Sequence, residues 1–239
     1  MSVDPAALHG DMNARVSVDT ESLEWQPSPS GSVLRKRLHR VGPAESGQVT
    51  SLVRYLPGAS FPEHPHPEGE EIYVLEGTFS DQNGHAQAGT HLLNPEGYRH
   101  APYSEAGCLI FVKLRQYDGV GREHHWTVSD AIDWQAGDEL GIDRKRLYEA
   151  EGFPDRVWLE RWAPEARIGP RVFPDGAEIL VIEGEYEDAE GRHGRLSWLR
   201  LPPGDSLEAT SQEGCTIYLK TGGCLLYTSD AADESSRGG

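Results

Sequence analysis

Four side chains that commonly bind metal ions stand at short or regular distances along this sequence. His64, His66 and Glu70 fall within one short segment, and His100 follows 30 residues after Glu70. Neutral imidazole suits Zn, Fe, Ni and Cu ions, and a carboxylate adds one negative charge that favours a divalent cation. We therefore predict that these four residues hold one divalent transition metal. Zn²⁺ and Fe²⁺ are both compatible with three histidines and one carboxylate.

Extended strands would bring these four side chains together. Side chains alternate between the two faces of a strand. His64, His66 and Glu70 share one parity, so an extended segment points all three toward one face. The prolines that alternate with the histidines cannot donate hydrogen bonds, which favours a strand edge or a loop. His100 must come from a neighbouring strand, after the turn predicted at 94–97.

The spacing matches both signature motifs of the cupin superfamily. The first motif, G-x5-H-x-H-x3/4-E-x6-G, is matched by Gly58, His64, His66, Glu70 and Gly77. Glu71 would leave only five residues before Gly77, so Glu70 fits the ligand position better. The second motif, G-x5-P-x-G-x2-H-x3-N, is matched by Gly89, Pro95, Gly97 and His100, with Ser104 where the family usually has Asn.

Three segments resemble the ChrR-type cupins more narrowly, namely Gly69–Asp81, His100–Ser104 and Phe111–Arg115. In that family the cupin is either the C-terminal half of a zinc-binding anti-sigma factor or a free-standing protein. Relatives with similar motifs include metal-dependent dioxygenases. The anti-sigma half carries its own His/Cys zinc site ahead of the cupin, whereas the first cysteine here is Cys108. The resemblance thus implies a free-standing cupin and argues against direct sigma-factor binding.

The chain also contains an internal duplication. Residues 51–113 align with residues 158–220 without gaps, with 21 identical pairs among 63. A period of about 100 residues indicates duplicated domains rather than a solenoid. Short runs of Ile, Val, Leu and aromatic residues between Gly, Pro, Asn and Asp predict strands. We therefore expect an all-β chain of two tandem cupin barrels, each a double-stranded β-helix or jelly roll.

The duplication predicts a division of the chain into four segments. They are a disordered N-terminal segment at 1–17, a metal-binding cupin domain at 18–118, a second, degenerate cupin domain at 119–222, and a disordered tail at 223–239 that resembles read-through of a sequencing adapter. His124 and His125 are expected to lie in a solvated linker between the two copies.

The second copy lacks the metal-binding residues. Arg171, Phe173, Ala177 and Leu207 stand at its four ligand positions, although the glycines and prolines of the scaffold persist. This loss favours a functional role for the histidines of the first copy. The second copy is expected to be a structural or dimerising partner, or a pocket for another ligand. Arg171 either holds an anionic ligand there or forms a structural salt bridge.

Composition limits the partners and the compartment. The formal net charge is -17 and the pI is near 4.9, which argues against non-specific binding to nucleic acid or to an anionic membrane. No run of 18 apolar residues is present, so no membrane span is expected. Three cysteines give no disulfide framework, and we predict a cytoplasmic protein. The expected partner is a small-molecule ligand or substrate, with a homodimer as an open option.

Two functions fit these observations. The first is a metal-dependent dioxygenase-type enzyme acting on a diketone or a similar small oxygenated carbon compound. The second is a zinc-binding sensor module related to the ChrR anti-sigma factors. The missing regulatory half favours the enzyme.

Overall fold

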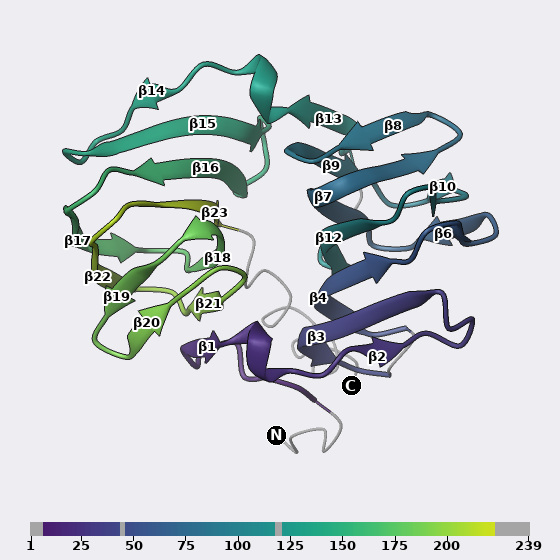
Figure 1. Ribbon diagram of the computed structural model, residues 1–239, viewed down its shortest axis with the longest axis horizontal. Helices are drawn as coiled ribbons and strands as arrows, with labels where there is room; N and C mark the ends of the chain where they lie inside the picture. Colours follow the sequence, from purple (N-terminus) through teal and green to yellow (C-terminus); the bar gives the residue numbers. More distant parts are fainter. Residues whose placement is uncertain (1–6, 44–45, 118–120, 223–239) are drawn as a thin grey trace, which may run out of the picture.

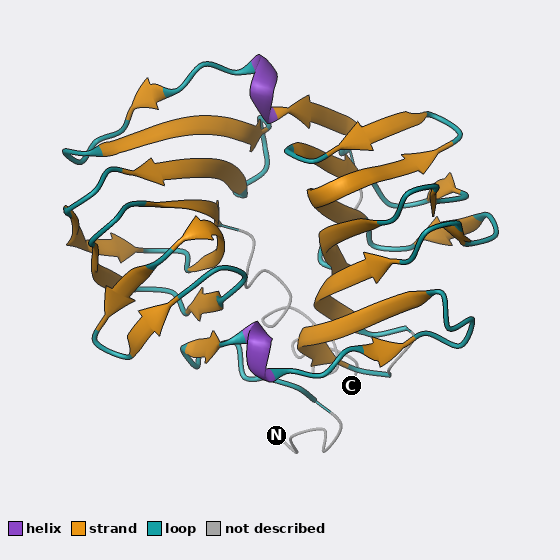
Figure 2. Cartoon of the chain, viewed as in Figure 1, coloured by secondary structure: helices purple, strands orange, loops and turns teal. Residues whose placement is uncertain are grey.

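We describe the chain from a computed structural model, which covers residues 7–43, 46–117 and 121–222 (Figure 1). Residues 1–6 and the tail at 223–239, both predicted to be disordered, lie outside the described residues. The described chain is built almost entirely of strands, with two single-turn 3₁₀ helices, η1 (Thr20–Ser22) and η2 (Ser129–Ala131) (Figure 2). In this part of the chain, no helix is long and apolar enough to cross a membrane.

The predicted pair of all-β barrels is confirmed. The main sheet of the first barrel has seven strands in a continuous order, which is β13 (His125–Val128), β9 (Thr90–Asn94), β7 (Glu70–Asp81), β12 (Cys108–Leu114), β4 (Gln48–Tyr55), β3 (Val33–Val41) and β2 (Gln26–Pro27). Short strands complete this barrel, namely β5 (Ala59–Ser60), β6 (His64–His66), β8 (Gly84–Gln87), β10 (Tyr98–His100) and β11 (Tyr103–Ser104).

The second barrel repeats this plan. Its main sheet has the order β1 (Val16–Val18), β21 (Trp198–Leu201), β18 (Ala177–Gly184), β23 (Cys215–Thr221), β16 (Arg156–Trp162), β15 (Ile142–Glu149) and β14 (Gln135–Ala136). Four strands form its second sheet, in the order β17 (Ala166–Phe173), β22 (Asp205–Ser211), β19 (Tyr186–Asp188) and β20 (Gly191–His193).

Strand alternation separates the barrel interior from the interface between the barrels. On β7, Ile72 and Val74 belong to the apolar interior of the first barrel. Tyr73, between them, belongs to a different cluster, which also contains Trp198 and Tyr218 of the second barrel. The two main sheets thus pack face to face, with one side of each strand facing its own barrel and the other side facing the partner barrel.

The barrels exchange one strand each. Strand β1 comes from the start of the chain but pairs with β21 of the second barrel. Strand β13 belongs to the second sequence copy but pairs with β9 of the first barrel. The exchange therefore crosses the predicted boundary between residues 118 and 119. It also places the half-buried His125 on an edge strand, so the expected solvated linker is wrong for His125, whereas His124 is exposed and lies outside the strands.

The N-terminal segment departs from the predicted disorder over residues 1–17. Leu8 forms an isolated β-bridge with Arg40, and Val16 begins β1. The Arg15 guanidinium makes ion pairs of 2.9 Å to Asp188 and 3.2 Å to Asp205, both on the second barrel. The segment has few apolar residues in a regular pattern, which is why the sequence predicts disorder. Ion pairs and backbone pairing hold its described part in place instead.

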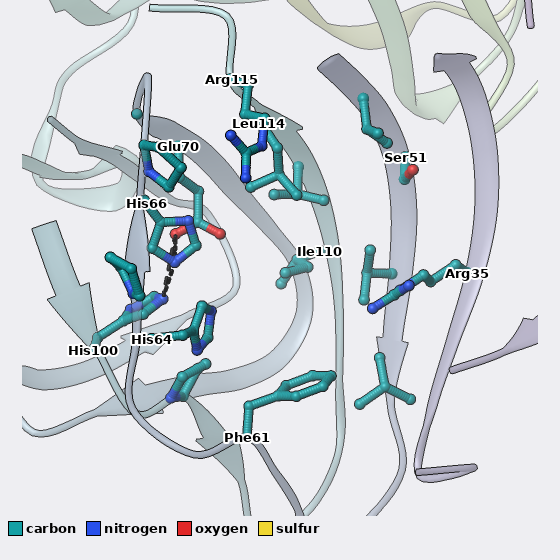
Figure 3. Close-up of a pocket in the computed structure, with 18 of the residues that line it drawn as sticks. Arg35, Ser51, Phe61, His64, His66, Glu70, His100, Ile110, Leu114 and Arg115 are labelled. Atoms are coloured by element: carbon teal, nitrogen blue, oxygen red, sulfur yellow. Dashed lines mark hydrogen bonds and ion pairs between the residues drawn. The ribbon is translucent and has the colours of Figure 1, made fainter. Parts of the chain in front are cut away.

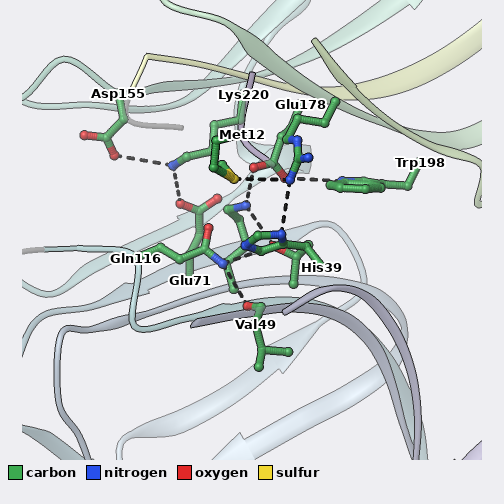
Figure 4. A network of polar contacts seen from close by, with 12 residues as sticks. Met12, His39, Val49, Glu71, Gln116, Asp155, Glu178, Trp198 and Lys220 are labelled. Atoms are coloured by element: carbon green, nitrogen blue, oxygen red, sulfur yellow. Dashed lines mark hydrogen bonds and ion pairs between the residues drawn. The ribbon is translucent and has the colours of Figure 1, made fainter. Parts of the chain in front are cut away.

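Two buried ion pairs join the barrels at equivalent positions of the two copies. Glu71 of the first barrel accepts a 2.7 Å contact from Lys220, and Glu178 of the second accepts a 2.6 Å contact from Lys113 (Figure 4). All four side chains are at most 3 % exposed. In the sequence alignment, Glu71 matches Glu178 and Lys113 matches Lys220. The two pairs are therefore reciprocal.

A buried histidine at this interface makes stability depend on pH. His39 is buried, and its Nδ1 lies 3.1 Å from the Arg200 guanidinium. Burial, helped by the charge of Arg200, lowers the pKa of His39 to about 4. The unfolded chain, with an ordinary histidine pKa near 6.5, binds a proton first as the pH falls. The contribution of the neutral His39 to stability is therefore fully present above about pH 6.5. It is lost as the pH falls from 6.5 toward 4.

We expect this histidine alone to lower the free energy of unfolding by about 1.4 kcal/mol between pH 7.5 and pH 5.5, the equivalent of one pKa unit. Urea unfolding at the two pH values measures the loss. A His39→Asn variant keeps a hydrogen-bond acceptor for Arg200 but does not titrate, so its loss should be smaller by that amount. An equal loss in both proteins would contradict the assignment.

Candidate metal centre

The candidate ligands come from three strands at one end of the first barrel. Strands β6 and β10 form a separate two-stranded antiparallel ribbon, in which His100 lies opposite His64 and Tyr98 lies opposite His66. Glu70 is the first residue of β7. The ribbon explains how two prolines fit beside the histidines, because it lies outside the main sheet. His100 does come from a neighbouring strand, as the turn at 94–97 predicted.

The three imidazoles and the carboxylate converge (Figure 3). One nitrogen from each of His64, His66 and His100 lies within 4.8 Å of the others. The Nε2 atoms of His66 and His100 are 2.8 Å apart, and Glu70 Oε2 lies 3.5 Å from each of them. This donor set of imidazole nitrogens and one carboxylate oxygen fits a divalent transition metal. The histidine cluster could hold such an ion.

Glu70 and Glu71 have separate roles, as alternation along β7 requires. The single extended segment predicted from His64 to Glu70 is wrong, because the chain turns at residues 67–68, where Glu68 has a φ of 56°. Glu70 faces the histidines, whereas Glu71 faces the second barrel and pairs with Lys220. Ser104, where the family usually has Asn, donates a 2.6 Å hydrogen bond from Oγ to the carbonyl of Thr78. It therefore contributes to strand packing and leaves the histidine cluster unchanged.

Three of the four candidate ligands, His64, Glu70 and His100, are oriented by a second contact. His100 Nδ1 lies 3.1 Å from Asp81 Oδ2, and His64 Nδ1 lies 2.9 Å from the carbonyl oxygen of Pro62. Asn94 Nδ2 donates a 2.8 Å hydrogen bond to Glu70 Oε2. Such contacts fix the tautomer and the direction of a metal-binding side chain. These contacts use Nδ1 of both histidines, which leaves their Nε2 atoms to face the cluster.

Burial and neighbouring charges set the protonation of the cluster. Burial lowers the pKa of His66, and the neighbouring His100 and His64 lower it further against the attraction of Glu70. Burial also opposes the charged form of His100, but the hydrogen bond to Asp81 and the charge of Glu70 outweigh it and raise the His100 pKa. His66 is therefore neutral and ready to bind a cation, whereas a proton on His100 competes with metal as the pH falls.

A cavity of about 360 Å³ lies against this cluster, inside the first barrel. All four candidate ligands line it. The remaining wall is mostly apolar, with Phe61, Val53 and Ile110 among its residues. The cavity is the size of a pocket for a small molecule. A ligand inside it would contact the barrel wall and the histidine cluster at once.

Sequence reasoning missed the residues that support the ligands and part of the cavity wall. Asp81, Asn94 and Arg115 belong to this group. Asp81 and Asn94 stand in turn motifs, where Asp and Asn usually have a local structural explanation. Only the folded barrel places these turns beside Glu70 and His100.

The corresponding site of the second barrel is filled. Phe173, Ala177 and Leu207 are buried in the apolar core of that barrel. Arg171 pairs with Glu160 at 3.0 Å and with Glu139, so the structural salt bridge predicted as one alternative is present. The second copy therefore offers no equivalent cluster of metal-binding residues within the described chain.

Cys108 and Cys215 are buried free thiols at equivalent strand positions. Burial raises the pKa of Cys108 to about 11 and that of Cys215 to about 12. A thiol that stays protonated is a poor nucleophile and a poor metal ligand. Both cysteines are therefore small buried residues of the strands, and Cys224 lies outside the described residues.

Comparison with known families assigns the chain. The family model of the ChrR cupin-like domain matches residues 13–118 and, a second time, residues 122–224. The chain belongs to the ChrR cupin-like family. The double match confirms the duplication, and it makes the protein a bicupin. No curated protein matches the bicupin significantly in sequence.

Solved structures share the fold at low sequence identity. A proposed dioxygenase from Nostoc punctiforme has a TM-score of 0.71 at 16% identity, over 91% of the bicupin and 85% of that chain. A bacterial pirin in complex with nickel(II), from Escherichia coli, gives 0.66 at 12% identity, over 87% and 99%. A salicylate 1,2-dioxygenase from Pseudaminobacter salicylatoxidans gives 0.58 at 11% identity, over 78% and 76%. At such identities the likeness shows the fold alone.

Replacing Asp81 should weaken metal binding without removing a ligand. An Asp81→Asn variant loses the negative charge that orients His100, and we expect metal affinity to fall by about 10- to 100-fold. Titration against a competing chelator measures this change. The matched control is Asp188→Asn, the same position in the second barrel, which should leave affinity unchanged. An equal loss in both variants would indicate a general effect on folding.

Proposed function

We propose that the bicupin is a metal-dependent dioxygenase that acts on a small oxygenated carbon compound. One observation carries the proposal, which is that the histidine cluster forms part of the wall of a substrate-sized cavity. A purely structural metal is normally enclosed by protein ligands, whereas a catalytic site leaves room for water or substrate. The dioxygenases among the solved structures of similar fold add support by analogy.

His64, His66, His100 and Glu70 would hold the metal, which we propose to be Fe²⁺. When bound there, Fe²⁺ would supply Lewis-acid polarisation of substrate oxygens and redox chemistry with O₂. Asp81 keeps His100 oriented, and Asn94 keeps one oxygen of Glu70 in place. These contacts fix the ligand set before substrate enters.

The cavity wall contributes binding and exclusion of water. Phe61, Val53 and Ile110 offer apolar surface to the carbon skeleton of the substrate. Burial, followed by the charge of Glu70, holds the pKa of Tyr55 well above its usual range, so this cavity residue remains a neutral phenol. Tyr55 therefore does not serve as a general base, and in this proposal the substrate reacts through oxygens that chelate the metal.

The reaction balances without a further reductant. Cleavage of one carbon–carbon bond of a 1,3-diketone by O₂ gives a carboxylic acid and a 2-oxo aldehyde or 2-oxo ketone. Both oxygen atoms enter the products. The four electrons that reduce O₂ come from the carbon–carbon bond that breaks and from one C–H bond of the carbon between the two carbonyls, whose proton ends on the carboxylic acid. A single metal site and one substrate cavity are sufficient for this stoichiometry.

Anaerobic reconstitution tests the proposal. The metal-free protein is loaded with Fe²⁺, its iron content is measured, and oxygen uptake is followed with a panel of 1,3-diketones. We expect substrate-dependent uptake in the wild type and none in His64→Ala. A protein with full iron occupancy that consumes no oxygen with any member of the panel would contradict the proposal.

A zinc-binding sensor is the second candidate, supported by the family relation to ChrR. Elemental mass spectrometry of protein purified anaerobically without a histidine tag separates the two. About one Fe per chain favours the oxygenase, whereas about one Zn per chain favours the sensor.

A further inference from the structure

The cavity beside the metal centre carries positive charge in a strongly acidic protein. Three arginines, Arg35, Arg37 and Arg115, line it. Glu70, a candidate metal ligand, is the one carboxylate among the lining residues of the described chain. The whole chain, by contrast, has a formal net charge of -17. A divalent metal would raise the positive charge of the cavity further, so the cavity favours an anion.

Arg115 stands closest in the fold to the metal ligands. It follows the last residue of β12, Leu114, which is the register partner of Glu70. Its backbone N–H donates a 3.0 Å hydrogen bond to the carbonyl of Gly69. Figure 3 shows its side chain beside Glu70 and His66, with Arg35 on the opposite wall. A substrate bound at the metal would therefore lie within reach of the Arg115 guanidinium.

Within the part of the chain that the structure describes, no side-chain hydrogen bond or ion pair engages the Arg115 guanidinium, although the residue is half-buried. Arg171, in the filled site of the second barrel, instead has two carboxylate partners, Glu139 and Glu160. A guanidinium presents a planar set of donors that matches a carboxylate. Arg115 keeps that donor set available in the cavity.

The backbone at Arg115 adds a second, independent observation. Its φ of 57° lies in the left-handed region, which an L-residue with a side chain occupies at a cost in free energy. The equivalent position of the second copy is Gly222, with a φ of 68°. Glycine adopts this conformation easily. The first copy therefore retains an arginine where the scaffold itself requires only a glycine.

Comparison of the two sequence copies distinguishes Arg115 from the other two arginines of the cavity. Arg35 and Arg37 have counterparts in the second copy, Arg144 and Arg146, although that copy has no metal-binding residues. Arg144 there forms ion pairs with Glu160 and Asp138. Arginine at these positions thus persists without the site. Arg115, like the four candidate ligands, occurs only in the copy that keeps the site.

We infer that Arg115 binds a carboxylate of the substrate, so that the substrate class is an oxygenated carboxylic acid rather than a neutral diketone. The inference rests on the proposed function, which supplies the end of the substrate that chelates the metal. The substrate would chelate the metal through two oxygens, place its carbon chain against the apolar wall, and present its carboxylate to Arg115.

The test uses a matched pair of probes that differ in one charge. They are 4,6-dioxoheptanoate, which has a 1,3-diketone and a carboxylate, and its neutral methyl ester. Calorimetric titration of the metal-loaded protein under anaerobic conditions gives both dissociation constants without turnover. We expect the acid to bind about 10- to 100-fold more tightly than the ester, as for a charge-assisted pair.

Three variants make the assignment specific. Arg115→Met should abolish the preference for the acid, Arg115→Lys should restore part of it, and Arg161→Met, a surface arginine of the second barrel, should leave it unchanged. Metal content and urea unfolding midpoints verify that each variant is folded and loaded. Equal affinities for acid and ester in the wild type, or a preference that survives in Arg115→Met, would overturn the inference.

The binding measurement and the oxygen assay can fail separately, so they distinguish the anion site from the dioxygenase activity. A preference for the acid that depends on Arg115, in a protein that consumes no oxygen, would support the anion site and contradict the dioxygenase. Oxygen uptake with the ester at the same rate and affinity as with the acid would support the dioxygenase and overturn the inference.

Discussion

A His66→Ala variant is expected to lose stoichiometric metal binding and, with it, all metal-dependent activity. His66 is buried, and its Nε2 lies 2.8 Å from that of His100 and 3.5 Å from Glu70. Removing an oriented ligand should weaken affinity by more than the roughly 10- to 100-fold typical of outer contacts, so we expect about 1,000-fold or more. Elemental mass spectrometry after extensive dialysis measures the metal content per chain.

The matched control is His85→Ala. His85 is an exposed histidine on β8, outside the cluster, and its removal should leave the metal content unchanged. The fold should tolerate both changes, because the His66 side chain contacts other ligands rather than the apolar core. Full metal content in His66→Ala would show that the cluster is not the metal centre. Metal loss in both variants would indicate a non-specific effect.

Breaking one of the buried ion pairs between the barrels should destabilise the protein more than any surface change. A Lys220→Met variant leaves the Glu71 carboxylate buried without its cation, although Tyr117 and Tyr218 still donate hydrogen bonds to it. We expect the free energy of unfolding to fall by about 3 to 5 kcal/mol. Urea unfolding monitored by tryptophan fluorescence measures the change.

The pH dependence of this site has the same sign as that of His39, because both groups have a lowered pKa in the folded protein. Burial raises the pKa of Glu71, but Lys220 and His91 outweigh it and hold the pKa well below its usual range. The stabilisation is therefore complete above the ordinary glutamate pKa of about 4.5 and is lost as the pH falls below it. In Lys220→Met the pKa of Glu71 rises toward its ordinary value, because the main cation that lowers it is gone, so this acid-dependent loss should be smaller than in the wild type.

A double-mutant cycle separates the pair from its surroundings. Glu71→Gln combined with Lys220→Met should lose less stability than the sum of the single variants, because neither leaves the other charge unpaired. The half-exposed pair between Arg195 and Glu76, also between the barrels, serves as control, and it should contribute about 0 to 1 kcal/mol. Similar losses at both pairs would contradict a special role for burial.

The sequence predicts the fold and the four candidate ligands because two motifs of fixed spacing carry them. Period-two alternation puts Glu70 and Glu71 on opposite faces of β7, and the motif spacing decides which of them faces the histidines. The prolines beside His64 and His66 exclude a central strand, and the structure has a separate ribbon there. Each of these predictions depends on residues a few positions apart.

The supporting residues escaped prediction because no motif in the sequence fixes their partners. Asp81 meets His100 across 19 residues, and Lys220 meets Glu71 across 149 residues. The signal for the interface was present, since Glu71 and Lys113 are identical in both copies although the metal ligands are not. A buried charge retained in a copy without a site indicates an interface. The exchanged strands β1 and β13 are too short for a periodic pattern to predict them.

The strand exchange and the reciprocal ion pairs together describe the ancestry of the chain. In an isologous contact, residue i of one subunit meets residue j of the other, and j meets i. Glu71 with Lys220 and Glu178 with Lys113 satisfy this relation about a pseudo-twofold axis. The chain is therefore arranged as two fused subunits of a strand-swapped dimer. The face through which two single-barrel chains would associate is already occupied within the bicupin, so that face is not available for contact with a second copy.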